Sequence, residues 1–537
     1  MQLEVGKIPP VLIPVNGRPI LESVVERYAD APGECSFVLV VNQGKELVKA
    51  HVLARHAAGN VRVVEVASEE DLGATLVSAL RQTNLEAYDA LILHFGDTLI
   101  EADIPYGRDA IFYQDLKESF RWTTFQTEGG KISRIVDKYV SESIDWNHVF
   151  TGLFAFERPQ ALLGHLEQCS AHSDIGLFYS ALQAYVADRD VALVKVKEWY
   201  DFGHSDNYYQ AKKRFINKRF FNVLEIDEHR AILKKKSANV DRFIGEIRWY
   251  LELPSSLRCY IPQVFDYSLE RNSAFIKMEY YGYTTIADLY MSSGYNLGIW
   301  NHVFDALFRL IQEMRTYQLH VSQAEINVAL KDMYVRKTLE RLEAISKHDA
   351  FSALFRDDIA INARDYKPLG WYVDRLPRIC ETILSGSLSC LSIVHGDLCI
   401  SNVLFDPKSR ILKMVDPRGK FGENTIYGDY RYELAKLSHS FNGSYELIVG
   451  DMATVSWKPG QIAYSVRLSD YQRTVSDMFN RRLHKLFPEQ ARSVALIEAL
   501  LFLSMVPLHA DSVSRQMVML ATGIEKLDRF VKESGIA

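Results

Sequence analysis

Three oxygen-bearing side chains near residue 400 have the types and spacing that phosphoryl transfer requires. Asp397 ends the run "IVHGD", and Asn402 follows five positions later in "LCISN". Asp416 ends a second apolar run, "ILKMVD", which we expect to form a hairpin with "NVLFD". A carboxylate can orient or deprotonate an attacking hydroxyl group. The amide and the second carboxylate, placed together at the mouth of a hairpin, suit Mg²⁺, which takes few protein ligands and keeps its waters.

Two residues further upstream are candidates for holding a nucleotide. Lys235 lies in the strand pattern "AILKKKS", where alternation puts it on the opposite face from Lys234 and Lys236. The pattern does not decide which face points at a nucleotide. Glu246 lies on the following amphipathic segment, "VDRFIGEIRWYLEL", which predicts a helix that stops at Pro254. A glutamate there can pair with the lysine and hold it on the ATP phosphates.

The stretches "HGDLCISN" and "VDPRG" resemble the catalytic and metal loops of the aminoglycoside phosphotransferase and choline kinase-like family, small-molecule relatives of the protein kinases. The resemblance covers roughly residues 217–450, with the motifs in the family's order. It implies a bilobal protein-kinase-like fold with ATP as co-substrate. It also implies that Asp397 is the catalytic base and that Asn402 and Asp416 are ligands of Mg²⁺.

Other residues of this half are candidates for ligand contacts. "KMEYY" stands where the family's hinge contacts adenine, which implies the backbone around Glu279 and Tyr280. The metal loop reads "DPRG", so Arg418 either approaches a phosphate or an acidic substrate or forms an outer salt bridge. Lys337 and Arg341 share one helix face at i, i+4. That face is either simply solvated or meets an anionic substrate entering the cleft.

Acidic residues also follow the metal loop, in "YGDYRYELAKLSHS". The family uses such residues to brace the catalytic loop or to bind substrate, and we expect bracing for Asp429 and Glu433. The ordered motifs argue against a purely structural origin. A pseudokinase that keeps these residues without activity remains an open alternative.

The first two hundred residues alternate β-branched runs with helical patterns, which predicts a mostly parallel, layered α/β domain. Several segments resemble sugar-phosphate nucleotidylyltransferases, in that family's order. They are "IPPVLIPVNGRPILE", "LGATLVSAL", "HFGDT", "VDKYV", "FTGLFAF" and "EWYDFGHSDNYYQA". The resemblance implies that Asp97 and Asp201 hold magnesium, that Gly73 approaches the base and that Lys138 contacts a sugar phosphate. A second nucleoside triphosphate would then bind this domain.

One part of that family's pattern is missing. Its glycine-rich loop, L-A-A-G-x-G-T-R, cradles a triphosphate with backbone amides and an arginine. This sequence shows no such loop ahead of Pro10, which stands where the family has lysine. A different grip on phosphate, binding without catalysis and a truncated chain are all compatible with this pattern, and we favour an impaired or altered domain. Asp97 is alternatively a strand-end residue that caps the next turn.

Length and composition agree with two soluble domains. The chain has 537 residues, and a change of pattern near residue 215 predicts domains at 1–215 and 216–537. The second is expected to divide into a sheet-rich lobe at 216–282 and a helical lobe at 283–537. A net charge of −6 argues against a chain that coats nucleic acid or an anionic membrane.

The remaining patterns concern location. Six scattered cysteines without a C-x-x-C pair, and a start without a signal-peptide pattern, favour a reducing cytoplasm. The apolar run "VALIEALLFLSMVPL" is too short for a membrane span and predicts a buried helix.

Together these patterns predict an α/β protein with an amino-terminal nucleotidyltransferase-like, layered Rossmann-type domain and a carboxyl-terminal kinase-like domain. The expected function is ATP- and Mg²⁺-dependent phosphorylation of a sugar, polyol or amino alcohol, whose product the first domain activates or binds. This pairing resembles proteins of bacterial surface-polysaccharide synthesis. The alternative is a non-catalytic scaffold that binds nucleotide or sugar. The acceptor, the preferred base and the oligomeric state, a homo-oligomer included, are left open.

Overall fold

The computed structural model describes most of the chain in two compact units, Lys7–Lys212 and Lys213–Ala537. The described residues are 9–12, 14–15, 18–41, 45–56, 60–66, 71–116, 119, 121–137, 147–169, 174–202, 222–227, 229–291, 297–421, 425–450, 452–466 and 468–535.

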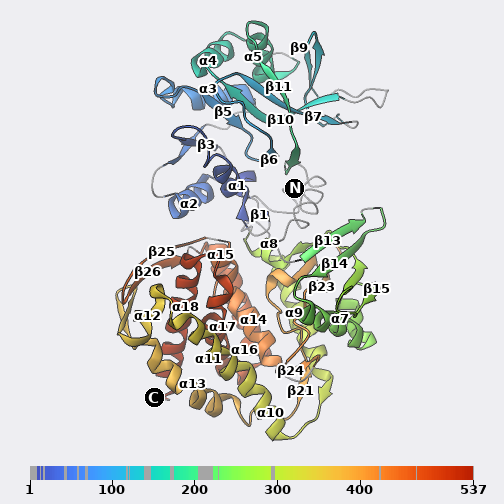
Figure 1. Ribbon diagram of the computed structural model, residues 1–537, viewed down its shortest axis with the longest axis vertical. Coiled ribbons are helices and arrows are strands. Elements are labelled where there is room, and N and C mark those ends of the chain that lie inside the picture. The colour runs from blue at the N-terminus through green and yellow to red at the C-terminus, as the bar shows by residue number, and fades with distance from the viewer. Residues whose placement is uncertain are drawn as a thin grey trace. The chain divides into compact units, whose positions relative to one another are not determined.

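The first unit is built on a six-stranded mixed sheet (Figure 1). Its order is β11-β7-β10-β8-β9, and β5 also pairs with β10. The strands are β5 (Leu91–His94), β7 (Ala110–Leu116), β8 (Thr124–Glu128), β9 (Lys131–Val136), β10 (Asn147–Phe156) and β11 (Ala192–Lys195). Smaller pairs are β1 (Pro14–Val15) with β2 (Arg18–Pro19), β3 (Phe37–Val41) with β4 (Val61–Glu65), and β6 (Thr98–Glu101) with β12 (Glu198–Asp201).

The prediction of a mostly parallel sheet is wrong for the described strands. Only β3–β4 and β11–β7 are parallel, and the other described pairs of this unit are antiparallel. The "TEGGK" turn between β8 and β9 explains one antiparallel pair, because Gly129 and Gly130 both have positive φ, as tight hairpin turns require. Alternation of strand and helix along the chain does not show which strands become neighbours.

Three helices of the first unit share the core with β10. They are α3 (Leu72–Arg81), α4 (Pro159–Gln168) and α5 (Gly176–Ala187). Leu162, Phe154 and Phe178 come from three of these elements and are buried in one apolar cluster. The remaining helices, α1 (Ile20–Arg27) and α2 (Lys45–Arg55), belong to a separate cluster with β3 and β4.

The second unit begins with a four-stranded antiparallel sheet in the order β13-β14-β16-β15. Its strands are β13 (Asn222–Asp227), β14 (Ile232–Ser237), β15 (Val264–Ser268) and β16 (Phe275–Glu279). Helix α7 (Val240–Glu252) follows β14, and the Asn239 side chain accepts from the Arg242 N–H at its start. The helix ends just before Pro254, where the sequence places its end.

The rest of this unit is mainly helical (Figure 1). Its helices are α8 (Ile286–Met291), α9 (Gly298–Thr316), α10 (Gln323–Leu330), the π-helical turn η4 (Lys331–Arg336), α11 (Lys337–Ser346), α12 (Asp349–Arg356), α13 (Leu369–Leu384), α14 (Tyr430–Phe441), α15 (Tyr445–Val449), α16 (Asp470–Leu486), α17 (Ala491–Met505) and α18 (Val513–Ser534). Short 3₁₀ turns are η1 (Pro10–Leu12) and η2 (Leu85–Ala87) in the first unit, and η3 (Ser255–Tyr260), η5 (Ile400–Asn402), η6 (Pro488–Gln490) and η7 (Val506–His509) here.

Three small sheets complete the helical part. They are β17 (Thr284–Thr285) with β22 (Val403–Asp406) and β23 (Ile411–Met414); β18 (Gln318–Leu319) with β21 (Leu391–Ile393) and β24 (Tyr427–Gly428); and β19 (Ile359–Ile361) and β20 (Arg364–Tyr366) with β25 (Ala453–Lys458) and β26 (Gln461–Val466).

The longest apolar stretch lies inside this helical part. Among the described residues, Pro488–His509 is the one helical stretch long and apolar enough to cross a bilayer, and 72% of its apolar window is buried in the fold. Helix α17 forms most of it, and Leu496, Ile497 and Phe502 are fully buried. The prediction of a buried helix is confirmed.

Candidate active site

A hairpin brings Asn402 and Asp416 to the same end of two strands. Strands β22 and β23 pair Val403 with Met414, as predicted, and the next N–H, from Val415, donates to the Asn402 carbonyl oxygen at 3.0 Å. Asp416 has φ +57°, a left-handed conformation that is uncommon outside glycine and concentrated at functional sites. Asn402 and Asp416, which are far apart along the chain, are therefore neighbours in the fold.

Asp397 is held by contacts on both of its carboxylate oxygens. Oδ1 lies 2.8 Å from Lys436 Nζ, and the Asn402 amide donates to Oδ2 at 3.3 Å and to the Asp397 carbonyl at 2.9 Å. Burial alone would raise the pKa of Asp397, but the Lys436 ammonium outweighs it and holds that pKa below its usual range. Asp397 is therefore a carboxylate at neutral pH, oriented by a cation and an amide.

Lys235 joins the small sheet to the metal loop. Its Nζ lies 2.7 Å from Glu246 Oε1 and 2.7 Å from Asp416 Oδ1. The pairing with Glu246 predicted from the sequence is present, and the structure also decides the face: Lys234 points the other way, 3.6 Å from Glu225. Burial would lower the pKa of Lys235, but the two carboxylates raise it above its ordinary value. Burial raises the pKa of Glu246 to about 7.

His395 connects the catalytic loop to the metal loop. Its Nε2–H donates to the Val415 carbonyl at 3.0 Å, while its Nδ1 accepts from the Asp397 N–H at 3.3 Å. Complete burial lowers the pKa of His395 to about 4, so the imidazole is neutral, as one donating and one accepting nitrogen require. The Arg418 N–H donates to the His395 carbonyl at 2.9 Å, which adds a second link between the loops.

The two acidic residues after the metal loop, Asp429 and Glu433, contact different parts of the fold. Glu433 Oε1 accepts from the Gly396 N–H at 2.9 Å, next to Asp397. Burial raises the pKa of Glu433 to about 8. Asp429 forms a buried ion pair with Arg431 at 2.8 Å and accepts from the Tyr334 hydroxyl at 2.9 Å. The Glu433 contact is the one expected of a residue that braces the catalytic loop. The side-chain contacts of Asp429 are to Arg431 and Tyr334, outside that loop, so its bracing role stays a prediction.

Two glycines allow the loops to approach their neighbours. Gly396 has φ +77°, and a Cβ there would lie 1.9 Å from the Phe421 ring. Gly419 has φ +78°, and a Cβ there would lie 2.2 Å from the Gly245 carbonyl carbon. The backbone of the metal loop therefore meets the backbone of α7 with no side chain between them. This contact places Asp416, in the metal loop, near Glu246, which follows Gly245 on α7.

Sequence reasoning missed Lys436, which directly contacts the predicted catalytic carboxylate. Its one signal is position: it follows Glu433 by three residues, so the two share a helix face. Lys436 is buried, and although burial would lower its pKa, the Asp397 carboxylate raises it well above its ordinary value.

The oxygen donors fit the magnesium ion that the family resemblance implies. The amide nitrogen of Asn402 is used by Asp397, which leaves its amide oxygen as a ligand atom. The side chain of Asp416 is 47% exposed, so its carboxylate is accessible from the cleft side as well as to Lys235. One amide and one carboxylate, completed by phosphate oxygens and water, are a donor set that Mg²⁺ accepts.

The hinge residues use their N–H groups inside the sheet. The Glu279 N–H donates to the Gln263 carbonyl at 2.8 Å, and the Tyr280 N–H donates to the Ala231 carbonyl at 2.7 Å. The adenine contact predicted here therefore falls to carbonyl oxygens or to the residues that follow, and it stays a prediction.

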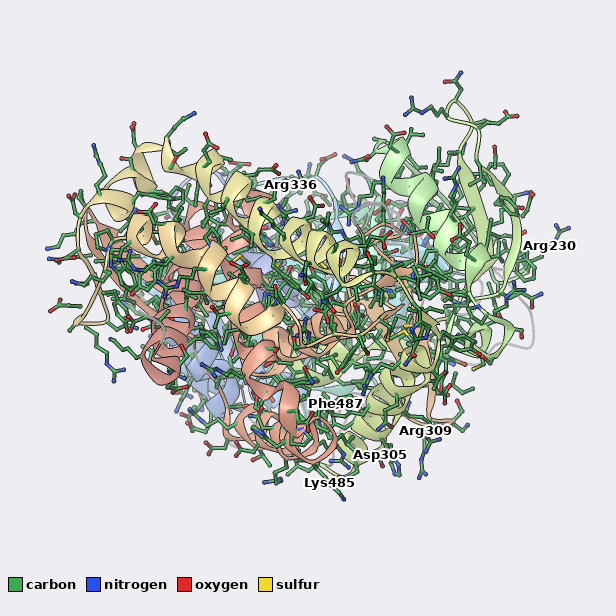
Figure 2. All side chains as sticks on the ribbon, turned by 90° about the horizontal axis from the view of Figure 1, so that it is seen from below. Arg230, Asp305, Arg309, Arg336, Lys485 and Phe487 are labelled. Carbon is green, nitrogen blue, oxygen red and sulfur yellow. The ribbon has the colours of Figure 1, made fainter. Side chains whose placement is uncertain are left out.

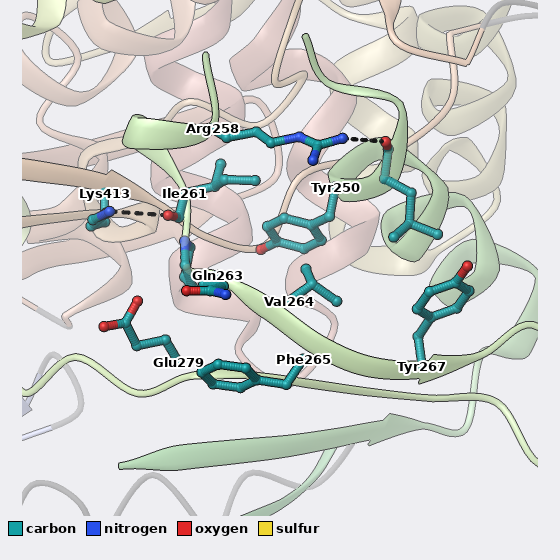
Figure 3. A pocket seen from close by; sticks show the side chains of 11 residues that line it. Tyr250, Arg258, Ile261, Gln263, Val264, Phe265, Tyr267, Glu279 and Lys413 are labelled. Carbon is teal, nitrogen blue, oxygen red and sulfur yellow. Dashed lines mark hydrogen bonds between the residues drawn. The ribbon is translucent and has the colours of Figure 1, made fainter. Parts of the chain in front are cut away.

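The Glu279 side chain instead borders a cavity of about 480 Å³ beside β15 (Figure 3). Lys413 stands at its edge and donates to the Ile261 carbonyl at 3.1 Å. Lys235, Asp397 and Asp416 do not line this cavity. Tyr250, which lines it, links it to the metal loop, because its hydroxyl accepts from the Asp416 N–H at 3.2 Å.

The three predicted substrate-side cations lie around the same loops. Lys337 Nζ is 5.7 Å from the Tyr432 ring centroid, and the Arg418 guanidinium is 5.7 Å from that of Phe421. Arg341 donates to the Ser504 carbonyl at 3.0 Å. None of the three forms an ion pair with a described residue, so the outer salt bridge considered for Arg418 is not found there.

In the first unit, Asp97 and Asp201 stand at adjoining strand ends. Strand β6 pairs with β12 so that Thr98 faces Asp201, and the Phe202 N–H donates to the Asp97 carbonyl at 2.7 Å. Asp201 Oδ2 accepts from the Trp122 indole at 2.8 Å. The backbones of Asp97 and Asp201 are therefore adjacent, and their binding of a metal stays a prediction.

The two other predicted residues of this unit receive no such support. Lys138 lies outside the described residues. A Cβ at Gly73 would lie 2.6 Å from the Leu177 side chain, so close helix packing explains the glycine. Its approach to a base stays a prediction.

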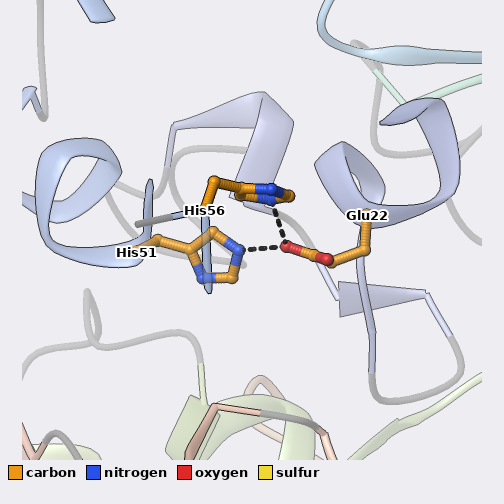
Figure 4. Close-up of side chains that lie close together, drawn as sticks. All are labelled: Glu22, His51 and His56. Carbon is orange, nitrogen blue, oxygen red and sulfur yellow. Dashed lines mark hydrogen bonds and ion pairs between the residues drawn. The ribbon is translucent and has the colours of Figure 1, made fainter. Parts of the chain in front are cut away.

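A separate cluster in the first unit consists of Glu22, His51 and His56 (Figure 4). Glu22 Oε1 lies 2.6 Å from His51 Nε2 and 3.1 Å from His56 Nε2. Glu22 and His51 are buried, so the imidazoles satisfy a carboxylate that has little access to water. The sequence analysis did not single out these residues.

The chain matches no family model and no curated protein. Solved structures of sugar nucleotidyltransferases align with its amino-terminal part. A putative glucose-1-phosphate thymidylyltransferase from Bacillus anthracis is 13% identical, with a TM-score of 0.32, over 39% of this chain and 88% of its own. HddC from Yersinia pseudotuberculosis is 13% identical, with a TM-score of 0.30, over 39% and 91%. A nucleoside-diphosphate-sugar pyrophosphorylase from Vibrio cholerae is 15% identical, with a TM-score of 0.31, over 38% and 92%. At these TM-scores the likeness carries no conclusion about this chain's activity.

Proposed function

We propose that the second unit is an ATP- and Mg²⁺-dependent phosphotransferase that acts on a hydroxyl group of a small compound. The observation that carries the proposal is the position of Lys235 Nζ, 2.7 Å from both Glu246 and Asp416. A buried lysine oriented by one carboxylate and adjacent to a metal-binding carboxylate is the arrangement that phosphoryl transfer from ATP uses.

Each side chain then has a distinct role. Asp397 orients the acceptor hydroxyl and receives its proton, Lys235 contacts the ATP phosphates, and Lys436 keeps Asp397 ionised. The acceptor oxygen forms a bond to the γ-phosphorus, while the bond from that phosphorus to the bridging oxygen breaks and leaves its electron pair on ADP. His395 and Glu433 hold the two loops in register during this exchange.

Asn402 and Asp416 would hold Mg²⁺, which supplies neutralisation of phosphate charge when it is bound. Asp416 would thereby contact both the metal and Lys235.

A direct assay tests the proposal. The full chain is incubated with ATP, Mg²⁺ and a panel of sugars, polyols and amino alcohols, and ADP release is measured. We expect release that depends on one class of acceptor and is lost in Asp397→Asn. Nucleotide binding that is independent of Mg²⁺, together with no acceptor-dependent release, would instead support a non-catalytic scaffold.

The first unit would act on the phosphorylated product, either by transferring a nucleotidyl group to it or by binding it. The adjoining ends of β6 and β12, which bring Asp97 and Asp201 together, support this part of the proposal. Kinase followed by nucleotidyl transfer is a logical order for making activated precursors of a surface polysaccharide. The product is supplied with CTP, UTP, GTP or ATP, and pyrophosphate is measured. Release that Asp97→Ala abolishes would support transfer, whereas binding of the product without release would support a binding role.

A further inference from the structure

The acceptor side of Asp397 carries an excess of positive charge. Lys337 begins α11 and Arg341 follows one turn later, while Arg418 extends from the metal loop. Lys337 lies over the Tyr432 ring, and Tyr432 is one helical turn before Lys436 on α14. Lys337 therefore lies next to the helix α14 that supplies Lys436, the partner of Asp397. Arg418 lies next to the catalytic loop, because its N–H donates to the His395 carbonyl.

The cations act on one another at short range. Burial lowers the pKa of Lys337 well below its usual value, and the charges of Arg418, Arg341 and Lys436 lower it further, while Asp397 opposes them. Burial also lowers the pKa of Arg341; Tyr432 and Glu340 oppose the shift, and the charges of Arg418 and Arg242 add to it. Five basic groups from α7, α11, α14 and the metal loop therefore share one region, Lys337, Arg341, Arg418, Lys436 and Arg242.

The neighbouring acids neutralise this region only in part: Asp332 interacts with Arg418 and Glu340 with Arg341, but the close ion pairs of these two acids are formed with Arg336. Asp397 pairs with Lys436, and Arg336, at the surface in Figure 2, pairs with both Asp332 and Glu340. Among the described residues, Lys337, Arg341 and Arg418 have no ion pair of their own. A like-charge group without counter-ions is unfavourable in the free protein and becomes favourable when an anion binds.

The position of α11 favours the acceptor over ATP as the source of the anion. Helix α11 packs on α17 and η7 within the helical part, whereas Lys235 comes from the small sheet. Lys235 and the metal ligands already provide contacts for the ATP phosphates. Lys337 and Arg341 belong to the helical part instead, where Lys337 lies over Tyr432 of α14.

Resting on the phosphotransferase function proposed above, we infer that the acceptor carries an oxyanion, a phosphate or a carboxylate, in addition to the hydroxyl that is phosphorylated. Lys337, Arg341 and Arg418 bind that oxyanion while Asp397 faces the hydroxyl. Two or three cations that converge on one oxyanion give charge-assisted hydrogen bonds and select against neutral polyols and amino alcohols.

Inorganic phosphate tests the site without knowledge of the acceptor. Its binding to the full chain is measured by calorimetry, alongside MgATP binding. We expect Lys337→Met to raise the dissociation constant of phosphate at least tenfold and that of MgATP less than twofold. Lys235→Met should have the reverse effect. Lys347→Met, at the exposed end of the same helix, is the matched control and should change neither. Equal phosphate binding by wild type and Lys337→Met, or none by wild type, would overturn the inference.

Steady-state kinetics distinguish a phosphate from a carboxylate on the acceptor, and also test the oxyanion inference apart from the kinase proposal. Matched acceptors are compared: glycerol, glycerol 3-phosphate and glycerate, and glucose, glucose 6-phosphate and gluconate. We expect turnover only with anionic members, and Arg418→Met should raise the acceptor KM at least tenfold with the ATP KM within twofold. If the neutral acceptors are turned over and Asp397→Asn abolishes that turnover, the oxyanion inference is refuted while the kinase proposal stands. MgATP binding that Lys235→Met leaves unchanged would refute the kinase proposal, whatever the phosphate result.

Discussion

Lys436 Nζ lies 2.8 Å from Oδ1 of Asp397; the lysine side chain is 5% exposed and the aspartate side chain 30% exposed. The pair is the one charge contact to Asp397 among the described ion pairs. Lys436 therefore sets the ionisation of the proposed base. Because burial alone would raise the pKa of Asp397, loss of the ammonium should move that pKa upward.

Lys436→Met should lower kcat and shift the acid limb of the pH–activity profile to higher pH. Catalysis needs the Asp397 carboxylate, and a raised pKa leaves less of it ionised on the acid side. We expect a loss of about 10²–10³-fold near neutral pH, as for removal of a charge at a general base. The pH profile of kcat/KM measures the displacement. Lys436→Arg keeps the charge and should restore the position of the acid limb, so an unmoved limb in Lys436→Met would contradict this role.

Lys235→Met should weaken MgATP binding by about tenfold or more, which corresponds to about 1.4 kcal/mol or more. Methionine keeps the length of the stem and removes only the ammonium that orients phosphate. The fold should persist, since Glu246, whose pKa burial raises to about 7, can take a proton when its cation is lost. Calorimetry on the full chain gives the affinity. Lys234→Met, on the opposite face of the same strand, is the control, and equal losses in both variants would refute the assignment.

The loops that carry Asp397, Asn402 and Asp416 could be predicted from the sequence because these residues lie close together along the chain. Asp397 and Asn402 are five positions apart, and the hairpin that brings Asp416 back needs only two short apolar runs. Lys235 was identified, but its face was not. Strand alternation fixes which residues share a face, whereas the packing of α7 decides which face is buried.

Other features depend on partners that are distant in sequence. All residues of α14 from Tyr430 to Phe441 are buried, so no polar face singles out Lys436. The excess charge around Lys337 also needs the metal loop and two helices to meet. The mixed sheet of the first unit was missed for the same reason, because the order of strands along the chain does not specify their neighbours.

Glu433→Gln should change how stability depends on pH. Burial raises the pKa of Glu433 to about 8, whereas a glutamate in an unfolded chain titrates at about 4.3. The folded state therefore keeps a proton that the unfolded chain releases, and this residue makes the free energy of unfolding fall as the pH rises from about 4.5 to about 8. Glutamine still accepts from the Gly396 N–H and has no such proton.

The variant should gain stability relative to the wild type across that range, by roughly 2–5 kcal/mol. Urea unfolding at about pH 5 and about pH 8 gives the two differences. Glu343→Gln, at an exposed position of α11, serves as the control and should leave the pH dependence unchanged. A difference between Glu433→Gln and wild type that stays constant with pH would show that Glu433 is ionised in the folded protein.

Gly419→Ala should separate steric overlap from backbone strain when compared with Gly460→Ala. Both glycines have positive φ, but a Cβ at 419 would lie 2.2 Å from the Gly245 carbonyl carbon, whereas the nearest atom at 460 is 3.5 Å away. We expect about 1–2 kcal/mol of destabilisation at Gly460. Overlap should add about 1–3 kcal/mol at Gly419 and weaken MgATP binding as Asp416 moves. Similar losses at the two sites would show that the metal loop yields without strain.

His51→Ala should destabilise the first unit more than His56→Ala. Both imidazoles contact Glu22 Oε1, but the His51 side chain is 1% exposed and that of His56 is 11% exposed. Loss of His51 leaves a carboxylate with one remaining imidazole and a buried void, at about 3–5 kcal/mol, whereas water can replace His56 at about 1–2 kcal/mol. Urea unfolding followed by tryptophan fluorescence measures both, with Glu46→Gln on the exposed side of α2 as the control.

The ligand atoms of Glu22, His51 and His56 also lie within 4.8 Å of one another, a spacing that a divalent ion accepts. A fall in the wild-type midpoint with EDTA, reversed by Zn²⁺ and absent in Glu22→Gln, would mean that a metal rather than the two hydrogen bonds holds this cluster.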